Sequence, residues 1–306
     1  MKTLWLFIFL FQIETWAQTT FSPFVFVPPR WENRTLIFVD KKIRKLFVYK
    51  VQNGKPISIF ETEADFGKND GFKTKRDDHK TPEGIYFPQT HLTAPAIPFN
   101  LYGNRAFTLD YPNLIDRTEG KTGSGIWIHS VPDNVPLTRG SRGCVVIRNK
   151  SIDELKSYVT LKETPVIIQS SDAIEDEEAS KAEVTTFLDT WKEAWISKDI
   201  DKYIQYYSAD FKNPGYNVRT WKDYKRKITD GSGEISIDFE EILTLKGHNQ
   251  YVISFVQKYK SEKLQDIGLK TLWLKKEDKN LKIIREDWNK IEQNAALLGL
   301  SKASDE

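Results

Sequence analysis

One cysteine and one histidine are the two side chains whose types and spacing could do chemistry. Cys144 is the only cysteine of the 306 residues and follows a glycine, while His129 ends the run Gly125–His129. An imidazole beside a thiol can take its proton or pair with the thiolate, which makes a strong nucleophile at neutral pH. The pair therefore predicts nucleophilic cysteine catalysis, whereas Cys144 alone would more often be a small buried hydrophobe.

The element that must carry His129 is a strand. Its alternation puts Trp127 and His129 on one face and two isoleucines on the other. A loop and a second strand that begins near Cys144 can then bring the thiol beside the imidazole. Gly143 has no side chain, so the backbone there can approach a ligand closely.

The first half of the chain has the pattern of a mostly β domain. Short apolar or alternating runs predict strands, and Asn53-Gly54 predicts a tight hairpin turn. Residues 65–84 are rich in Gly, Lys and Asp and predict a long loop. One helix is expected over 152–159, with Ser151 as its N-cap. The expected strands are 35–39, 45–49, 57–63, 84–87, 106–110, 125–129, 144–147 and 165–169.

The hydrophobic period becomes helical after residue 182. Asp199 is expected to cap a second helix, and a third is expected to begin near Trp221. Helices followed by antiparallel strands are typical of an α+β domain. The first helix has an apolar face of Val184, Phe187, Leu188, Trp191 and Trp195. The strands are expected over 234–245, 251–259, 270–275 and 281–288.

Length and composition exclude several classes of protein. A chain of 306 residues is longer than the usual domain of about 100–200 residues, so two domains are expected. Lys and Arg total 45 against 43 Asp and Glu, a balance that gives no support to nucleic-acid binding. A single cysteine excludes an intramolecular disulfide. The lack of a histidine-rich cluster favours chemistry without a metal or another cofactor.

The N-terminus predicts export. Lys2 and the apolar Leu4–Phe11 precede the small-residue site Thr15–Ala17, a pattern typical of a secretory signal peptide cleaved after Ala17. An uncleaved anchor or simply a hydrophobic terminus is the alternative. The mature protein is expected in the periplasm or otherwise outside the cytoplasm. The expected organisation is 1–17 signal peptide, 18–34 N-terminal lead-in segment, 35–169 first domain, 170–182 acidic linker, 183–290 second domain and 291–306 C-terminal tail.

The order and spacing of His129 and Cys144 resemble those of a known family. Together with the residues Ser141–Val145, they look like the signature of the L,D-transpeptidase (YkuD-like) catalytic domain. Lys80–Gly84 is similar to the Thr-Pro-x-Gly turn of that family, and the runs at 36–40 and 45–49 resemble its opening hairpin. The resemblance covers about residues 35–169 and implies a mostly β catalytic domain. The second half resembles the smaller, cone-shaped α+β fold of nuclear-transport-factor-like domains.

The resemblance implies roles for the residues around the pair. The backbone carbonyl of Ser130, where many members have glycine, would orient the imidazole. The backbone N–H groups of Cys144 and Gly143 would stabilise an oxyanion. Arg142 stands where most members have histidine, which leaves the nucleophile and the base in place. The residues expected to contact the substrate are Ser141, Arg142, Arg139, Tyr111 and Asn113. For each of them, formation of a turn or a charge exposed to solvent is the alternative interpretation.

The resemblance further implies an enzyme that acts on peptidoglycan stem peptides. Cys144 would attack the carbonyl of the third stem residue, diaminopimelate, and release the terminal D-Ala. Arg142, the segment Asp110–Asn113 and the C-terminal extension resemble a subgroup of L,D-carboxypeptidases of curved or helical bacteria, whose product is a tripeptide. The alternatives are an L,D-transpeptidase that forms 3-3 cross-links or attaches proteins to the wall, and a wall- or partner-binding module.

The second domain is expected to bind the wall or a protein partner, and the subgroup resemblance also suggests a homodimer. The linker 170–182 lacks large core-forming side chains, so few contacts are expected to depend on it. A chain of residues 18–170 is therefore expected to keep a reactive Cys144.

Overall fold

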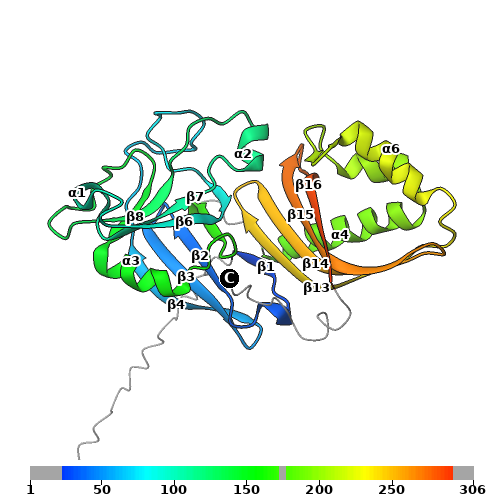
Figure 1. The fold of residues 1–306 in the computed structure, drawn as a ribbon, viewed down its shortest axis with the longest axis horizontal. Helices are drawn as coiled ribbons and strands as arrows, with labels where there is room; N and C mark the ends of the chain where they lie inside the picture. Colours follow the sequence, from blue (N-terminus) through cyan, green and yellow to red (C-terminus); the bar gives the residue numbers. More distant parts are fainter. Residues whose placement is uncertain (1–22, 172–176, 292–306) are drawn as a thin grey trace, which may run out of the picture.

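The computed structural model describes residues 23–171 and 177–291, which form two halves that lie side by side (Figure 1). Two sheets with short helices make up the first half. The second has a five-stranded sheet with helices against it and a small two-stranded sheet. This confirms the expected mostly β domain followed by an α+β domain. The signal peptide expected at 1–17 and nearly all of the tail lie outside the described residues. None of the helices in the described ranges is long and apolar enough to cross a membrane.

The first sheet begins with the expected hairpin. Asn53 and Gly54 have φ angles of 53° and 71°, and both must be positive in a two-residue turn that matches the twist of its strands. The strand order is β4-β3-β2-β10-β5, in which β10 is parallel to β2. The strands are β2 (Thr35–Asp40), β3 (Lys45–Gln52), β4 (Lys55–Glu63), β5 (Gly84–Tyr86) and β10 (Val166–Gln169).

The second sheet carries His129. Its order is β6-β7-β8-β9, and β8 runs parallel to β9 with His129 opposite Val146. Apolar side chains of both sheets, such as Ile37 and Ile128, pack into one core. No strand was expected at β6, because its half-exposed residues lack a clear apolar period. The elements are β6 (Pro88–Thr93), α1 (Phe99–Tyr102), β7 (Arg105–Leu109), α2 (Leu114–Thr118), β8 (Trp127–Val131) and β9 (Val145–Arg148).

The helix after β9 begins earlier than its sequence indicates. α3 (Asn149–Leu155) continues as η2 (Lys156–Tyr158), and its N-cap is Arg148. The cap expected at Ser151 is therefore wrong, and the Ser151 hydroxyl instead lies 2.8 Å from that of Thr62. A tertiary contact fixes the earlier start, since the buried Asn149 side chain accepts a hydrogen bond from the Asn104 amide at 2.9 Å.

The C-terminal half is a sheet with helices packed on one face. Its strand order is β1-β13-β14-β15-β16. Asp199 caps α5 as expected, because its Oδ1 accepts a hydrogen bond from the Lys202 amide at 2.9 Å. The apolar face expected of the first helix is buried throughout. The elements are α4 (Glu177–Ile196), α5 (Ile200–Tyr203), η4 (Ile204–Tyr206), β11 (Lys212–Asn213), β12 (Tyr216–Asn217), α6 (Val218–Thr229), β13 (Ser236–Gly247), β14 (Gln250–Lys260), β15 (Gln265–Glu277) and β16 (Asn280–Lys290).

The segment before the first domain is part of the C-terminal sheet. β1 (Phe24–Phe26) pairs antiparallel with β13, and η1 (Pro29–Trp31) follows it. Arg30 Nη2 donates a hydrogen bond to the Ser254 carbonyl at 2.8 Å, and Nε donates to the Glu241 carbonyl at 3.1 Å. The chain therefore passes from the C-terminal sheet to the first half after η1, and returns after β10.

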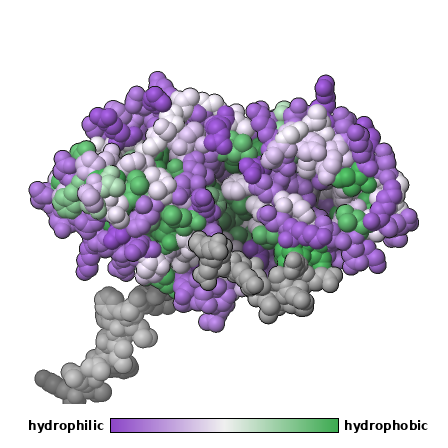
Figure 2. All heavy atoms as spheres, in the orientation of Figure 1, coloured by the Kyte–Doolittle hydropathy of each residue, from purple (hydrophilic) through white to green (hydrophobic). Residues whose placement is uncertain are grey.

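The two halves share an apolar core. Leu36 and Ile167 of the first half pack in one buried cluster with Leu245 and Val252 of the C-terminal sheet. That sheet lies between the first half and helices α4 and α6 (Figure 1), and apolar surface lies where the halves meet (Figure 2). Separating the halves, as in a chain of residues 18–170, would therefore expose this shared core to water. The composition of the linker predicts only the contacts of the linker itself, whereas the contacts between the halves come from strand faces far from it in the sequence.

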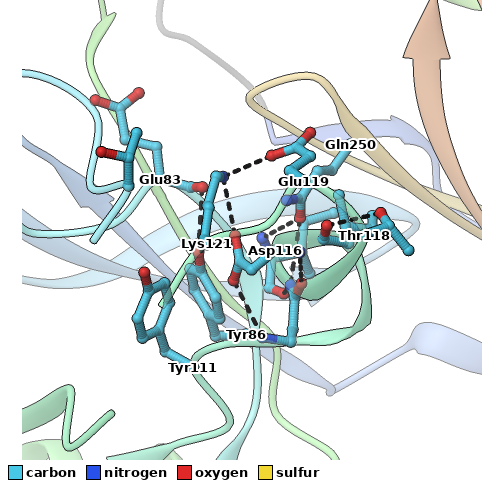
Figure 3. A network of polar contacts seen from close by, with 12 residues as sticks. Glu83, Tyr86, Tyr111, Asp116, Thr118, Glu119, Lys121 and Gln250 are labelled. Atoms are coloured by element: carbon cyan, nitrogen blue, oxygen red, sulfur yellow. Dashed lines mark hydrogen bonds and ion pairs between the residues drawn. The ribbon is translucent and has the colours of Figure 1, made fainter. Parts of the chain in front are cut away.

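A polar network lies beside this core, around α2 (Figure 3). Asp116 is fully buried, and its Oδ1 pairs with Lys121 Nζ at 2.9 Å. The Tyr86 hydroxyl donates a hydrogen bond to the Glu83 carbonyl at 3.2 Å. Gln250 of β14 accepts a hydrogen bond from the Ile85 amide at 3.1 Å. Apolar and polar contacts together thus hold β5 against the C-terminal half.

The shared core predicts that a change in the C-terminal sheet destabilises the protein. Leu245 is 1% exposed, so Leu245→Ala should lower the free energy of unfolding by about 2–5 kcal/mol through lost burial and a cavity. The matched control is Leu264→Ala, since Leu264 is 50% exposed and its truncation should change stability by about 0.5 kcal/mol or less. Chemical denaturation measures both, and equal effects would contradict the packing described above.

Candidate active site

His129 and Cys144 line one cavity of about 830 Å³ in the first half, called here the His–Cys cavity. His129 lies on β8, and Cys144 directly precedes β9, whose Val145 pairs with Ile128. The parallel pairing of these two strands brings both side chains to the cavity. The remaining lining comes from the loop after β4, from α1, from the segment before β8 and from the loop between β8 and β9.

The His129 ring is oriented by a backbone carbonyl. Its Nδ1 lies 2.8 Å from the carbonyl oxygen of Ser130, which is the contact that the family resemblance implied. A carbonyl can only accept, so Nδ1 carries the proton and Nε2 has the free lone pair of a base. The Tyr102 ring meets the imidazole edge-on at 5.1 Å. Burial lowers the pKa of His129 below its usual value, although the bond to Ser130 acts to raise it.

The Cys144 thiol is protonated in the resting site. Burial raises its pKa to about 11, against smaller opposing effects from the Trp127 backbone and the Lys73 charge. Its Sγ lies 3.5 Å from the Gly125 carbonyl. Because burial penalises both the thiolate and the imidazolium, thiol and imidazole are both neutral here. A proton passed between them would create two opposite charges that stabilise each other.

The turn before Cys144 is closed by Ser141. Its hydroxyl donates a hydrogen bond to the Cys144 carbonyl at 2.8 Å and accepts one from the Gly143 amide at 3.1 Å. The Gly143 amide therefore already has an acceptor within the turn. Gly143 has a φ of 127°, and a Cβ there would lie 2.6 Å from the Lys80 carbonyl oxygen. Only glycine fits where the loop before β5 packs on this turn.

The structure separates the residues expected to bind substrate. Arg142 is exposed and lines the His–Cys cavity, as does Ser141. Arg139 instead pairs with Asp70 and lines a neighbouring cavity. Tyr111 and Asn113 are buried and do not belong to the lining of the His–Cys cavity. Their side chains are used within the fold, because the Tyr111 hydroxyl donates to the Thr122 carbonyl at 3.2 Å and Asn113 caps α2.

Several lining residues were not anticipated from the sequence. Lys73, Arg76 and Asp77 reach the His–Cys cavity from the loop after β4. Asp65 also lines it, and its carboxylate pairs with Arg44 Nη2 at 2.6 Å. The only sequence signal was the charged, glycine-rich composition of 65–84, which indicates a loop but not what it faces. Across the described residues, no group of three His, Cys, Asp or Glu side chains could hold a metal ion.

A second cavity, of about 190 Å³, lies in the C-terminal half. Lys225 and Lys270 share one carboxylate there, that of Glu286, and all three are buried. Lys225 Nζ lies 4.6 Å from the Trp221 ring centroid and 4.8 Å from that of Trp195. Burial, with repulsion from Lys270, lowers the pKa of Lys225 to about 8 despite the nearby Glu286. This C-terminal cavity therefore combines aromatic walls with an excess of positive charge.

Comparisons with known proteins agree with this arrangement. Residues 34–168 match the L,D-transpeptidase catalytic domain, and residues 183–287 match the Cds6 C-terminal NTF2-like domain. The structure of Bd1075 from Bdellovibrio bacteriovorus is similar over 88% of this chain and 98% of its own, at 40% identity and a TM-score of 0.73. The helical cell shape determining protein Pgp2 of Campylobacter jejuni is similar over 84% and 92%, at 30% identity and a TM-score of 0.64. No curated protein sequence matched the chain.

The neutral resting pair predicts an unusual pH dependence of thiol alkylation. Because Cys144 is the only cysteine, iodoacetamide reports on it alone. The alkylation rate of the folded protein should still rise between pH ~9 and ~10, because the thiolate is the reactive form and burial raises the pKa of Cys144 to about 11. In denaturant the thiol should titrate near its ordinary pKa of about 8.5. A rate that is already constant at neutral pH would instead mean a preformed thiolate.

Proposed function

We propose that this chain, which belongs to the L,D-transpeptidase family of peptidoglycan enzymes, is an L,D-carboxypeptidase that shortens stem tetrapeptides to tripeptides. One observation carries the proposal. His129 and Cys144 line the same cavity, and the hydrogen bond of Nδ1 to the Ser130 carbonyl at 2.8 Å leaves Nε2 free to act as a base. This pairing suits acyl transfer through a thioester.

In the proposed reaction, the Cys144 proton passes to Nε2 of His129 as Sγ bonds to the carbonyl carbon of diaminopimelate. The Cys144 amide stabilises the oxyanion, since the Gly143 amide already donates to Ser141. The C–N bond then breaks, and the imidazolium gives its proton to the departing D-Ala amine. Water, deprotonated by His129, attacks the thioester and releases the tripeptide carboxylate and the thiol.

The choice of water as acceptor is argued from Arg142. Its guanidinium is exposed on the His–Cys cavity and lies two residues before the nucleophile. A fixed positive charge favours a donor stem carboxylate and opposes the approach of a protonated amine from an acceptor stem. Both effects favour hydrolysis. The alternative is an L,D-transpeptidase that forms 3-3 cross-links or attaches proteins to the wall.

We also propose that the enzyme works outside the cytoplasm and contributes to cell shape. Members of the family are cell-wall enzymes, and the similar Pgp2 is a helical cell shape determining protein. The signal-peptide pattern that ends at Ala17 supports export to the periplasm. Tripeptides would lack the terminal D-Ala that later cross-linking reactions use as a leaving group.

The catalytic roles predict the effect of two substitutions on tetrapeptide turnover. Cys144→Ala should abolish release of D-Ala because it removes the proposed nucleophile. His129→Ala should lower turnover by about 100-fold or more because no base takes the thiol proton. The matched control is His91→Ala, since His91 stacks on Phe107 outside the His–Cys cavity and should leave turnover unchanged.

Mass spectrometry of purified disaccharide tetrapeptide at high concentration distinguishes the products. Tripeptide and free D-Ala should dominate with the wild-type enzyme. An excess of 3-3 linked dimers would make the enzyme a transpeptidase, and full activity of Cys144→Ala would remove the cysteine from the mechanism.

The C-terminal cavity supports a second role, binding of the wall. Lys225 and Lys270 share a single carboxylate among tryptophans, an arrangement suited to an anionic fragment with an apolar or sugar face. The cavity lies in the half away from Cys144, so it would hold the sacculus without taking part in the chemistry. A protein partner is the alternative occupant.

Wall binding predicts different effects on intact and soluble substrates. Lys225→Met should lower turnover of intact sacculi several-fold, because the cavity loses a cation, and should leave turnover of soluble tetrapeptide unchanged. Lys222→Met is the matched control, since this lysine of α6 pairs with the exposed Asp201 outside the cavity. Equal losses on both substrates would mean that the cavity supports the fold rather than binding the wall.

A further inference from the structure

The loop between β4 and β5 is built around a buried ion pair. Lys73 is 3% exposed, and its Nζ pairs with Asp78 Oδ1 at 2.6 Å. The Asp78 carboxylate also accepts hydrogen bonds from the amides of Thr74, Lys75 and Lys80, at 2.9, 3.1 and 3.1 Å. Burial acts to raise the pKa of Asp78, but these donors lower it to about 2. The carboxylate therefore stays charged and holds residues 73–80 in one shape.

This shape presents two adjacent, oppositely charged side chains to the His–Cys cavity. Arg76 and Asp77 are both exposed and both line it. The Arg76 amide donates to Thr122 Oγ1 at 3.1 Å, and the Thr122 amide donates to the Thr74 carbonyl at 3.1 Å. Asp77 has a φ of 59°, an uncommon backbone state that the surrounding contacts must hold in place.

The charges around the cavity are otherwise neutralised within the protein. Lys73 pairs with Asp78, and Asp65 pairs with Arg44. In the part of the chain that the structure describes, Arg76, Asp77 and Arg142 form no ion pair, although all three line the cavity. One anionic and two cationic groups thus remain for a ligand.

We propose that Arg76 and Asp77 form a subsite for the zwitterionic side-chain end of the third stem residue. That end carries a carboxylate and an ammonium on one carbon, which matches an arginine next to an aspartate. Arg142, close to the nucleophile in sequence, is left for the carboxylate of the departing D-Ala. The inference rests on the proposed function and names the part of the substrate that the loop binds. Both side chains act in binding and neither takes part in bond breaking.

The test combines a protein change with a matching substrate change. Purified enzyme is given a tetrapeptide with the free side-chain carboxylate of diaminopimelate, or one in which that carboxylate is an amide. Arg76→Ala should lower kcat/KM about ten-fold on the free acid, mainly through KM, because a charge-assisted contact is lost. On the amide, wild type and Arg76→Ala should differ little, since the partner of the arginine is already missing.

Two further variants sharpen this test. Asp77→Asn removes the charge while keeping a residue that tolerates positive φ. It should lower kcat/KM on the unmodified stem and have little effect on a stem whose side-chain amine is acetylated. Lys75→Ala is the control, because Lys75 is an exposed neighbour outside the lining of the cavity. It should behave as wild type on every substrate.

The outcomes separate this inference from the proposed function. If the wild-type enzyme releases no D-Ala from either stem, the carboxypeptidase assignment fails and the subsite fails with it. If the wild type is active but Arg76→Ala loses the same factor on acid and amide, the enzyme assignment stands and the subsite is wrong. Thermal unfolding of Arg76→Ala and of Arg76→Gln checks that both variants fold. If both are stably folded and both lose kcat/KM on the free acid but not on the amide, the subsite is supported.

Discussion

The parallel pairing of β8 with β9 is the constraint on which the candidate site depends. Val145 pairs with Ile128, and Val146 pairs with His129, so the residue before β9 is fixed relative to the histidine. Successive side chains of a strand point to opposite faces, so a register slip of one residue would turn His129 into the core. The packing of Ile128 and Ile147 in the core between the sheets therefore holds the histidine in place as well as the fold.

Burial around this pairing determines the electrostatics. It keeps the thiol and the imidazole neutral, and two carboxylates at or beside the cavity each have a cation next to them, as Asp65 has Arg44 and Asp78 has Lys73. An unpaired buried charge would lower the stability of the fold by roughly several kcal/mol, so these pairs are needed to keep the loops folded. Loops held in this way leave Arg76 and Arg142 as exposed charges at the cavity.

The shared core joins the chemistry to the C-terminal half. Ile85 of β5 packs against the C-terminal sheet, and its amide is bonded to Gln250. The same β5 follows the loop whose Lys80 carbonyl lies against Gly143. Through β5, the C-terminal half thus helps to hold the turn that precedes Cys144, in addition to carrying a cavity of its own.

The sequence by itself determined the local features, and the tertiary structure decided the contacts. The hairpin at Asn53-Gly54, the Asp199 cap, the apolar face of α4 and the placement of His129 and Cys144 at one cavity were predictable, because turn chemistry, capping and residue spacing act within short segments. The interface between the halves, the burial of Tyr111 and Asn113, and the arrival of Arg76 at the cavity were not. These depend on which faces of distant elements meet, and the residues of one segment do not encode that.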